Sequence, residues 1–226
     1  MTTVAILNAR LLDPATDYDG PGGVLIENGR IVRVVHGVSL IDADQTIDAD
    51  GHCLAPGLID IRVKTGEPGA EPKETLKSAS LAAAGGGVTT IVVQPDTDPA
   101  VDDPAMIDFI QRRGAALNLV NVRAAGAATK ALDGQRMAEI GLMDEAGALY
   151  FTDGDKVIVN SRTLQRVMSY AAAFNALIAC RPSDPWLTEG AVAASGELAT
   201  RLGLSGSPAI AERIGLERDL DRKSVV

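Results

Sequence analysis

Charged side chains that could line a polar site alternate along one short segment, residues 54–69. Within it, Asp60, Arg62 and Lys64 alternate with β-branched apolar residues. This alternation predicts a strand that has three charged side chains on one face and apolar side chains on the other. Such a charged face is either a solvated edge or the lining of a polar site. The glycine and proline cluster at 66–69 favours a site, because loops at strand ends often carry function.

Composition narrows the class of protein. The 226 residues fit one large or two small domains, and 21 basic against 30 acidic residues argue against nucleic acid or an anionic membrane as a partner. The apolar runs are shorter than the ~20 residues that span a bilayer, and the N-terminus reads as a strand, not a signal peptide. Two cysteines, Cys53 and Cys180, form no disulfide framework. We therefore expect a cytoplasmic protein.

The first part of the chain, residues 1–53, predicts a small β-sandwich portion. Apolar alternation separated by turn residues predicts strands at 4–12, 23–27, 30–35 and 44–49. Asn28-Gly29 predicts a tight hairpin between the second and third strands. The only two histidines, His36 and His52, fall in or beside this region, and both are interpreted as surface or turn residues.

Residues 54–226 alternate strand and helix patterns, which is typical of a parallel sheet. Strands are predicted at 58–64, 89–94, 117–124, 148–152 and 176–180, and helices at 71–84, 104–113, 135–146, 161–174, 189–202 and 208–220. Because a TIM barrel needs eight strand–helix units, five units predict a partial (β/α) barrel. An open five-stranded α/β sheet remains the alternative. The final residues lack a helix stop signal, so we expect the front part of a longer protein.

A family resemblance rests on the same segment. Pro56-Gly57-x-x-Asp60 and Glu67-Pro68-Gly69 stand where the dihydroorotases of the amidohydrolase superfamily carry the same residues. Two further segments, 126–134 and 202–208, are also similar to that family. The resemblance is greatest to its non-catalytic homologues and covers the N-terminal part only. It implies that residues 1–53 are half of a sandwich and that 54–226 are an incomplete amidohydrolase barrel.

The resemblance also implies where a metal would be held. The family's first two ligand histidines fall on Arg62 and Lys64, its bridging aspartate on Asp153, and a further histidine on Cys180. Zinc binds histidine, cysteine or carboxylate, so the two cations cannot serve. No metal is therefore expected, and the family's general-base aspartate would lie beyond residue 226. We also hypothesise that Arg62 or Lys64 pairs with Asp153 in place of the metal.

The substrate positions are altered too. The family's arginine that grips a substrate carboxylate falls on Gly66, and its substrate-binding asparagine falls on Asp96. A negative charge at position 96 would repel a carboxylate substrate. The resemblance therefore implies a catalytically inactive dihydroorotase-like protein of pyrimidine biosynthesis that acts as a structural partner of aspartate carbamoyltransferase.

Two other functions stay open. The chain is alternatively an active dihydroorotase or related cyclic-amide hydrolase, with zinc held by Asp153 and Cys180, or a non-functional truncated fragment. Self-association into a homo-oligomer is also left open. Trp186 is either an exposed anchor for a partner or a residue packed on the barrel rim.

Overall fold

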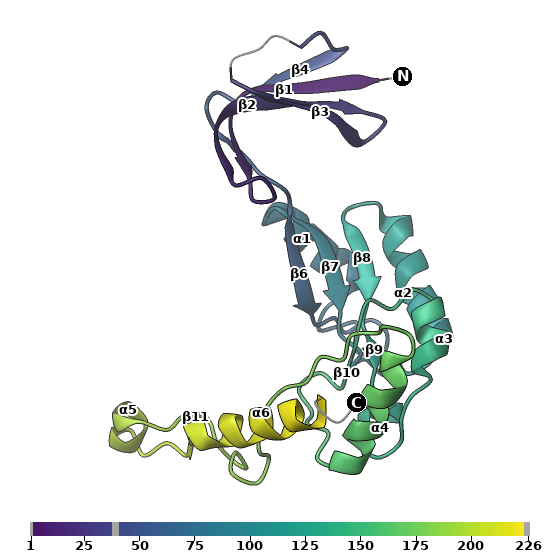
Figure 1. Ribbon diagram of the computed structural model, residues 1–226, viewed down its shortest axis with the longest axis vertical. Coiled ribbons are helices and arrows are strands. Elements are labelled where there is room, and N and C mark those ends of the chain that lie inside the picture. Colours follow the sequence, from purple (N-terminus) through teal and green to yellow (C-terminus); the bar gives the residue numbers. More distant parts are fainter. Residues whose placement is uncertain (1, 38–40, 224–226) are drawn as a thin grey trace. The chain divides into compact units, whose positions relative to one another are not determined.

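The computed structural model describes residues 2–37 and 41–223. It divides into two compact units, Met1–Gly57 and Leu58–Val226. The division follows the Pro56-Gly57 turn, a few residues after the boundary expected from the sequence. Each unit is drawn in Figure 1 and is described by itself.

The first unit is a β-sheet in the strand order β3-β2-β1-β4, with β5 also paired to β1. Its strands are β1 (Thr3–Asp13), β2 (Tyr18–Glu27), β3 (Arg30–His36), β4 (Gln45–Asp48) and β5 (Cys53–Leu54). All four predicted strands are confirmed. The predicted hairpin is confirmed as well, since Asn28 and Gly29 both have positive φ, 50° and 75°. Ile31 and Val32 on the edge strand β3 remain more than half exposed.

The second unit contains a three-stranded parallel sheet in the order β6-β7-β8. The strands of this sheet are β6 (Leu58–Val63), β7 (Val88–Val93) and β8 (Asn121–Ala124). Two short parallel pairs lie outside it. They are β9 (Gly126–Ala127) with β10 (Phe151–Thr152), and β11 (Ala193–Ala194) with β12 (Gly206–Ser207). Within residues 58–223 these pieces do not join into one closed cylinder. Strand–helix alternation is thus present, but barrel closure is not.

Helices follow the strands of the second unit. They are α1 (Leu76–Gly85), α2 (Pro104–Leu117), α3 (Ile140–Glu145), α4 (Ser161–Ala172), α5 (Glu197–Arg201) and α6 (Ala209–Lys223), with a 3-10 turn η1 (Lys130–Leu132). Asp103 caps α2 as its sequence position favours, its side chain accepting from the Met106 N–H. None of the described helices is long and apolar enough to cross a membrane.

Several predicted boundaries are wrong for local reasons. α1 begins at Leu76 and not at 71, because Thr75 caps it through a reciprocal contact with Ser78. The residues predicted to begin a strand at 117 instead finish α2, which ends at Asn118 in the left-handed conformation. At 176–180 there is only an isolated parallel bridge, Ile178 with Phe151. The expected helix 189–202 is reduced to α5.

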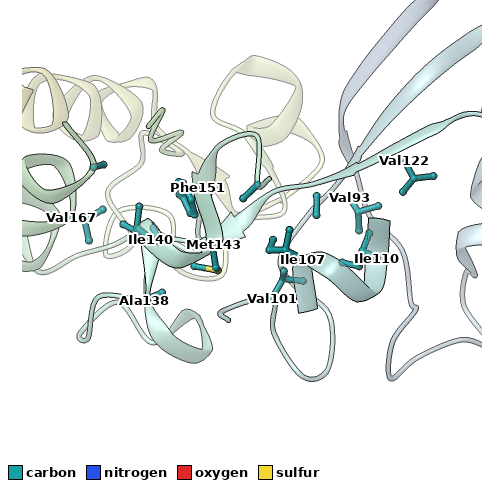
Figure 2. Packing of buried hydrophobic residues seen from close by; sticks show 14 of the residues in the cluster. Val93, Val101, Ile107, Ile110, Val122, Ala138, Ile140, Met143, Phe151 and Val167 are labelled. Atoms are coloured by element: carbon teal, nitrogen blue, oxygen red, sulfur yellow. The ribbon is translucent and has the colours of Figure 1, made fainter. Parts of the chain in front are cut away.

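The core of the second unit lies between the sheet and its helices. Ile91, Val92 and Val93 of β7 are at most 1% exposed, as predicted for a central parallel strand. Figure 2 shows Val93 and Val122 of the sheet facing Ile107 and Ile110 of α2. Each such side chain contributes about 1.5–3 kcal/mol on burial. This core holds the strand ends that carry the charged residues.

Candidate functional site

Five charged side chains meet beyond the carboxyl ends of β6, β7 and β10, and we call them the mouth cluster. They are Arg62, Lys64, Asp96, Asp155 and Arg181. Lys64 Nζ lies 2.7 Å from Asp96 Oδ2 and also pairs with Asp155 Oδ2. Arg62 Nη2 pairs with Asp155 Oδ1, and Arg181 Nη1 lies 3.6 Å from the same oxygen. Lys64 therefore bridges two carboxylates that come from different loops.

Strand direction explains why these residues meet. In parallel strands the carboxyl ends lie at the same edge of the sheet, so the residues that follow them converge there. Arg62 and Lys64 are two positions apart and share a face, as the alternation predicts. Asp155 follows Gly154, whose φ of +65° turns the chain after β10.

Lys64 and Asp155 stabilise each other's charged forms. Hydrogen bonding to Asp155 is the main cause of the raised pKa of Lys64, and Asp96 adds to it. The same contact with Lys64 is the main cause of the lowered pKa of Asp155. Because the Lys64 and Asp155 side chains are 50% and 45% exposed, each pair contributes no more than about 1 kcal/mol to stability. The main effect of the cluster is therefore that its charges neutralise one another, and its contribution to stability is small.

The hypothesis that Arg62 or Lys64 pairs with Asp153 is wrong. Asp153 is 4% exposed, and its oxygens accept from Thr129 N at 2.9 Å and from Thr129 Oγ1 at 2.5 Å. The cations pair instead with Asp155, two residues further on. The reason is that Thr129 already donates hydrogen bonds to the Asp153 carboxylate inside the fold, whereas the Asp155 carboxylate lies half-exposed at the mouth. Burial raises the pKa of Asp153.

Cys180 lines a small pocket of about 10 Å³ with Asp153, and Arg218 and Asp219 lie at its other side. Burial raises the pKa of the Cys180 thiol to about 11, and Asp219 adds to the rise. The thiol is therefore protonated at neutral pH, and a metal ion bound there would have to displace its proton.

A divalent metal does not fit the residues at these positions. Two of the four family ligand positions carry cations that are already paired, Arg62 and Lys64. Among residues 2–37 and 41–223, no group of three or more His, Cys, Asp or Glu side chains is arranged to hold a metal ion. His36 and His52 both lie in the first unit, where His36 packs against Tyr18 with ring centroids 4.0 Å apart.

Position 66 has no room for a side chain. The Gly66 N–H donates to Glu74 O at 2.8 Å, and Ala70 N–H donates back to Gly66 O at 2.5 Å. A Cβ on Gly66 would overlap the Ala70 carbonyl oxygen. An arginine that reaches into the mouth from this position therefore requires a different path of the loop at 66–74.

Glu67 ties this loop to two helices. It is 7% exposed, its Oε2 accepts from the N–H of Leu76 at 2.8 Å, and its Oε1 accepts from Arg113 Nε at 3.0 Å. Leu76 is the first residue of α1, and Arg113 lies in α2. A carboxylate at a helix N-terminus satisfies a free N–H and is favoured by the helix dipole.

A half-open pocket of about 300 Å³ adjoins the cluster, lined by Arg62, Arg181 and Tyr150 among others. Tyr150 Oη donates to the carbonyl of Ile61, and Gln94 Nε2 lies 2.6 Å from Tyr150 Oη. Burial raises the pKa of Tyr150. The phenol is thus a neutral donor that holds the β6 backbone.

Residues 51–220 match the family model described as dihydro-orotase-like. The chain belongs to this family. A dihydroorotase from Syntrophus aciditrophicus is 35% identical over 218 residues, which are 96% of this chain and 51% of that protein. A dihydroorotase-like protein from Pseudomonas putida is 38% identical over the same shares of each chain. The chain spans about half the length of these relatives.

Solved structures confirm the fold. The L-hydantoinase from Arthrobacter aurescens superposes with a TM-score of 0.80 at 21% identity, covering 100% of this chain and 51% of that one. The resemblance inferred from the Pro-Gly-x-x-Asp and Glu-Pro-Gly pieces is thus confirmed at the level of the family and of the N-terminal half.

The sequence pointed to Arg62, Lys64, Asp96, Asp153 and Cys180, and the structure brings the first three together. Asp153 and Cys180 share a separate pocket. The roles of Asp155 and Arg181 in the cluster were missed, although each stands within two residues of a family position. Spacing did not carry this signal, because the choice between Asp153 and Asp155 depends on the contact of Asp153 with Thr129.

Proposed function

We propose that this chain is a non-catalytic member of the dihydro-orotase-like family that acts in the cytoplasm as a structural partner of aspartate carbamoyltransferase. One observation carries the non-catalytic part: Lys64, at a position where the family resemblance places a metal ligand, bridges Asp96 and Asp155. An ammonium group there supplies positive charge but has no coordination site at which to activate water. The partnership rests on the resemblance to inactive homologues.

The substrate side supports the same proposal. Position 66 carries no arginine and is closed by Ala70, so the mouth lacks the side chain that would grip a carboxylate from that loop. Asp96 adds negative charge in place of a neutral amide. Arg62 and Arg181 do lie at the mouth, but both are paired with Asp155. A carboxylate substrate would have to compete with that aspartate.

An active dihydroorotase or related cyclic-amide hydrolase is the second candidate. It is favoured by the pocket that Asp153 and Cys180 share, because both are groups that zinc accepts. The relative from Syntrophus aciditrophicus is itself named a dihydroorotase. This candidate needs at least one further ligand and a deprotonated Cys180.

Metal content separates the two candidates. Protein purified without chelator is analysed for zinc beside the double variant Arg62→His/Lys64→His, which supplies two imidazoles at the mouth beside Asp96 and Asp155. The proposal expects far less than one zinc per unmodified chain and a gain in the double variant. Lys77→His, an exposed change on α1, is the control and leaves the zinc content unchanged. Near-stoichiometric zinc in the unmodified chain, with turnover of dihydroorotate, overturns the proposal.

The partnership is tested apart from catalysis. The chain is mixed with aspartate carbamoyltransferase from the same organism, and the mass of the complex is measured by light scattering after gel filtration. Co-migration in a fixed ratio supports the structural role. Folded, monodisperse chain that elutes separately at micromolar concentrations refutes that part of the proposal, and aggregated chain favours a non-functional fragment.

A further inference from the structure

Asp155 lies at the centre of the mouth cluster, and three cations converge on its carboxylate. Its Oδ1 pairs with Arg62 Nη2 and lies 3.6 Å from Arg181 Nη1, and its Oδ2 pairs with Lys64 Nζ. Each of the three cationic side chains is about half exposed, so solvent reaches all of them. Convergent arginine and lysine side chains are typical of a site for a multiply charged anion. The Asp155 carboxylate is thus an occupant that the chain itself supplies.

Two of the cations are held at the mouth by contacts that do not use this carboxylate. Lys64 Nζ lies 2.7 Å from Asp96 Oδ2. Arg181 Nη1 donates to the backbone carbonyl oxygen of Asp155 at 3.4 Å. Both contacts survive a rotation of the Asp155 side chain, so these cations keep facing the mouth when the carboxylate turns away.

The turn that carries Asp155 is also fixed independently of its side chain. The Lys156 N–H donates to Asp153 O at 3.1 Å, and the Gly154 N–H donates to Thr152 Oγ1 at 3.1 Å. The Asp155 side chain is 45% exposed. Rotation about its χ1 can therefore take the carboxylate into solvent without any change in the turn.

Charge selects the anion that replaces it. With Asp155 turned away, three cations face one carboxylate, Asp96, which leaves an excess of two positive charges. A free monocarboxylate has the same charge as Asp155 and competes against the high effective concentration of a tethered group. A phosphate dianion has twice the charge and offers at least three oxygens to three donors.

Two cavities beside the cluster give room for such a ligand. One of about 300 Å³ is lined by Arg62 and Arg181 together with the apolar Leu177 and Pro182. The other, of about 1030 Å³, is lined by Asp155 and Arg181 among others. A phosphate held by the cations therefore has space next to it for the remainder of a monoester.

We propose that the mouth cluster binds a phosphate group in place of the Asp155 carboxylate. The phosphate is held by Arg62, Lys64 and Arg181, and Asp155 closes the site when no phosphate is bound. This binding requires neither a metal ion nor a reaction, and it is independent of the partnership with aspartate carbamoyltransferase.

Calorimetric titration of the whole chain at pH 8 tests the proposal, with inorganic phosphate, phenyl phosphate and acetate as probes. The unmodified chain is expected to bind phosphate with a Kd in the millimolar range or tighter, and acetate at least about 10-fold more weakly. Asp155→Ala removes the occupant and is expected to tighten phosphate binding at least about 10-fold. Adding Arg181→Gln to Asp155→Ala should weaken binding again by at least about 10-fold.

Glu145→Ala is the matched control, because it removes the same charge from an exposed residue of α3 and should leave the phosphate Kd within about two-fold. Asp155→Asn keeps the size of the side chain and is expected to tighten binding as Asp155→Ala does, which guards against a folding defect of the alanine variant. Circular dichroism verifies that each variant is folded.

The two phosphate probes distinguish the source of the ligand. Tighter binding of phenyl phosphate identifies a monoester, and tighter binding of inorganic phosphate identifies the free ion; each result supports the site. No binding of either probe by the unmodified chain overturns the proposal. Acetate that binds as tightly as phosphate does so too, as does an equal phosphate Kd for the Asp155 variants and Glu145→Ala.

Discussion

Replacing Glu67 with alanine tests whether a residue that this chain shares with the family motif has a structural role here. Glu67 is buried and accepts two hydrogen bonds, one from the first N–H of α1 at Leu76 and one from Arg113 in α2. If these contacts position the loop after β6, their loss must lower the free energy of unfolding of the second unit. If Glu67 served only a reaction, its replacement would leave the free energy of unfolding unchanged.

The contacts give the magnitude. Leu76 is fully buried, so its N–H would lose its acceptor at a cost of about 1–3 kcal/mol. The Arg113 side chain is 51% exposed, so that pair adds at most about 1 kcal/mol. The charge near the helix N-terminus adds about 0.3–1 kcal/mol. Glu67→Ala is therefore expected to cost about 2–4 kcal/mol, which lowers Tm by roughly 5–15 °C in a domain of this size.

Thermal unfolding followed by circular dichroism measures this shift. Glu67→Gln keeps an acceptor for the Leu76 N–H and loses the charge, so it is expected to cost only about 1 kcal/mol. Glu189→Ala, an exposed change in a loop, is the control and should leave Tm within about 1 °C. Equal Tm values for Glu67→Ala and Glu189→Ala would refute the assigned role of Glu67.

Three further outcomes follow from the site. Lys64→Met should remove a contribution to the free energy of unfolding of up to about 1 kcal/mol. In the unmodified chain this contribution is fully present between pH 3.8, the ordinary pKa of Asp155, and pH 10.5, the ordinary pKa of Lys64. It is lost as pH falls through the lowered pKa of Asp155, and it is also lost as pH rises through the raised pKa of Lys64. Urea titrations from pH 3 to 12 check it, and unchanged profiles in the variant would contradict it. Gly66→Arg is expected to lower Tm, because its Cβ meets Ala70 O, whereas a variant as stable as the unmodified chain would show the loop to be adaptable. Iodoacetamide should label Cys180, an exposed residue, about 100-fold more slowly in the folded chain than in urea at pH 7.5, given a pKa of about 11 against an ordinary 9.0. Equal rates by mass spectrometry would contradict the raised pKa of the thiol.

Local patterns in the sequence predicted the first unit and the central strand well. Asn28-Gly29 specifies its turn through positive φ. β7 is recognisable because its residues are all β-branched, and its last three, Ile91 to Val93, are buried as in a central parallel strand. The start of α1 was harder to predict, because several polar residues before Thr75 could also have served as its N-cap. The strand expected at 176–180 reduces to one bridge, which depends on tertiary pairing that periodicity does not encode.

The candidate site was likewise predicted only in part. Alternation correctly put Arg62 and Lys64 on one face of β6, but the identity of their partner depended on which of two nearby aspartates faces inward. Thr129 decides that, because its N–H and hydroxyl both bind Asp153, and it lies 24 residues away in the chain. A contact over that separation has no signature in a single sequence.

In the family motif at 56–69, the positions that match the family and the positions that differ from it have different structural roles. Glu67 satisfies a helix N–H, and Gly69 has a φ of +99° and approaches the Asp98 backbone where a Cβ would not fit. Both therefore hold the backbone whether or not a reaction takes place. Positions 62 and 64 only project side chains into the mouth, and cations there are tolerated because Asp155 and Asp96 neutralise them. The motif thus contains positions that hold the backbone, 67 and 69, and positions that only present charge to the mouth, 62 and 64, and a substitution at the first pair is expected to cost more stability than one at the second.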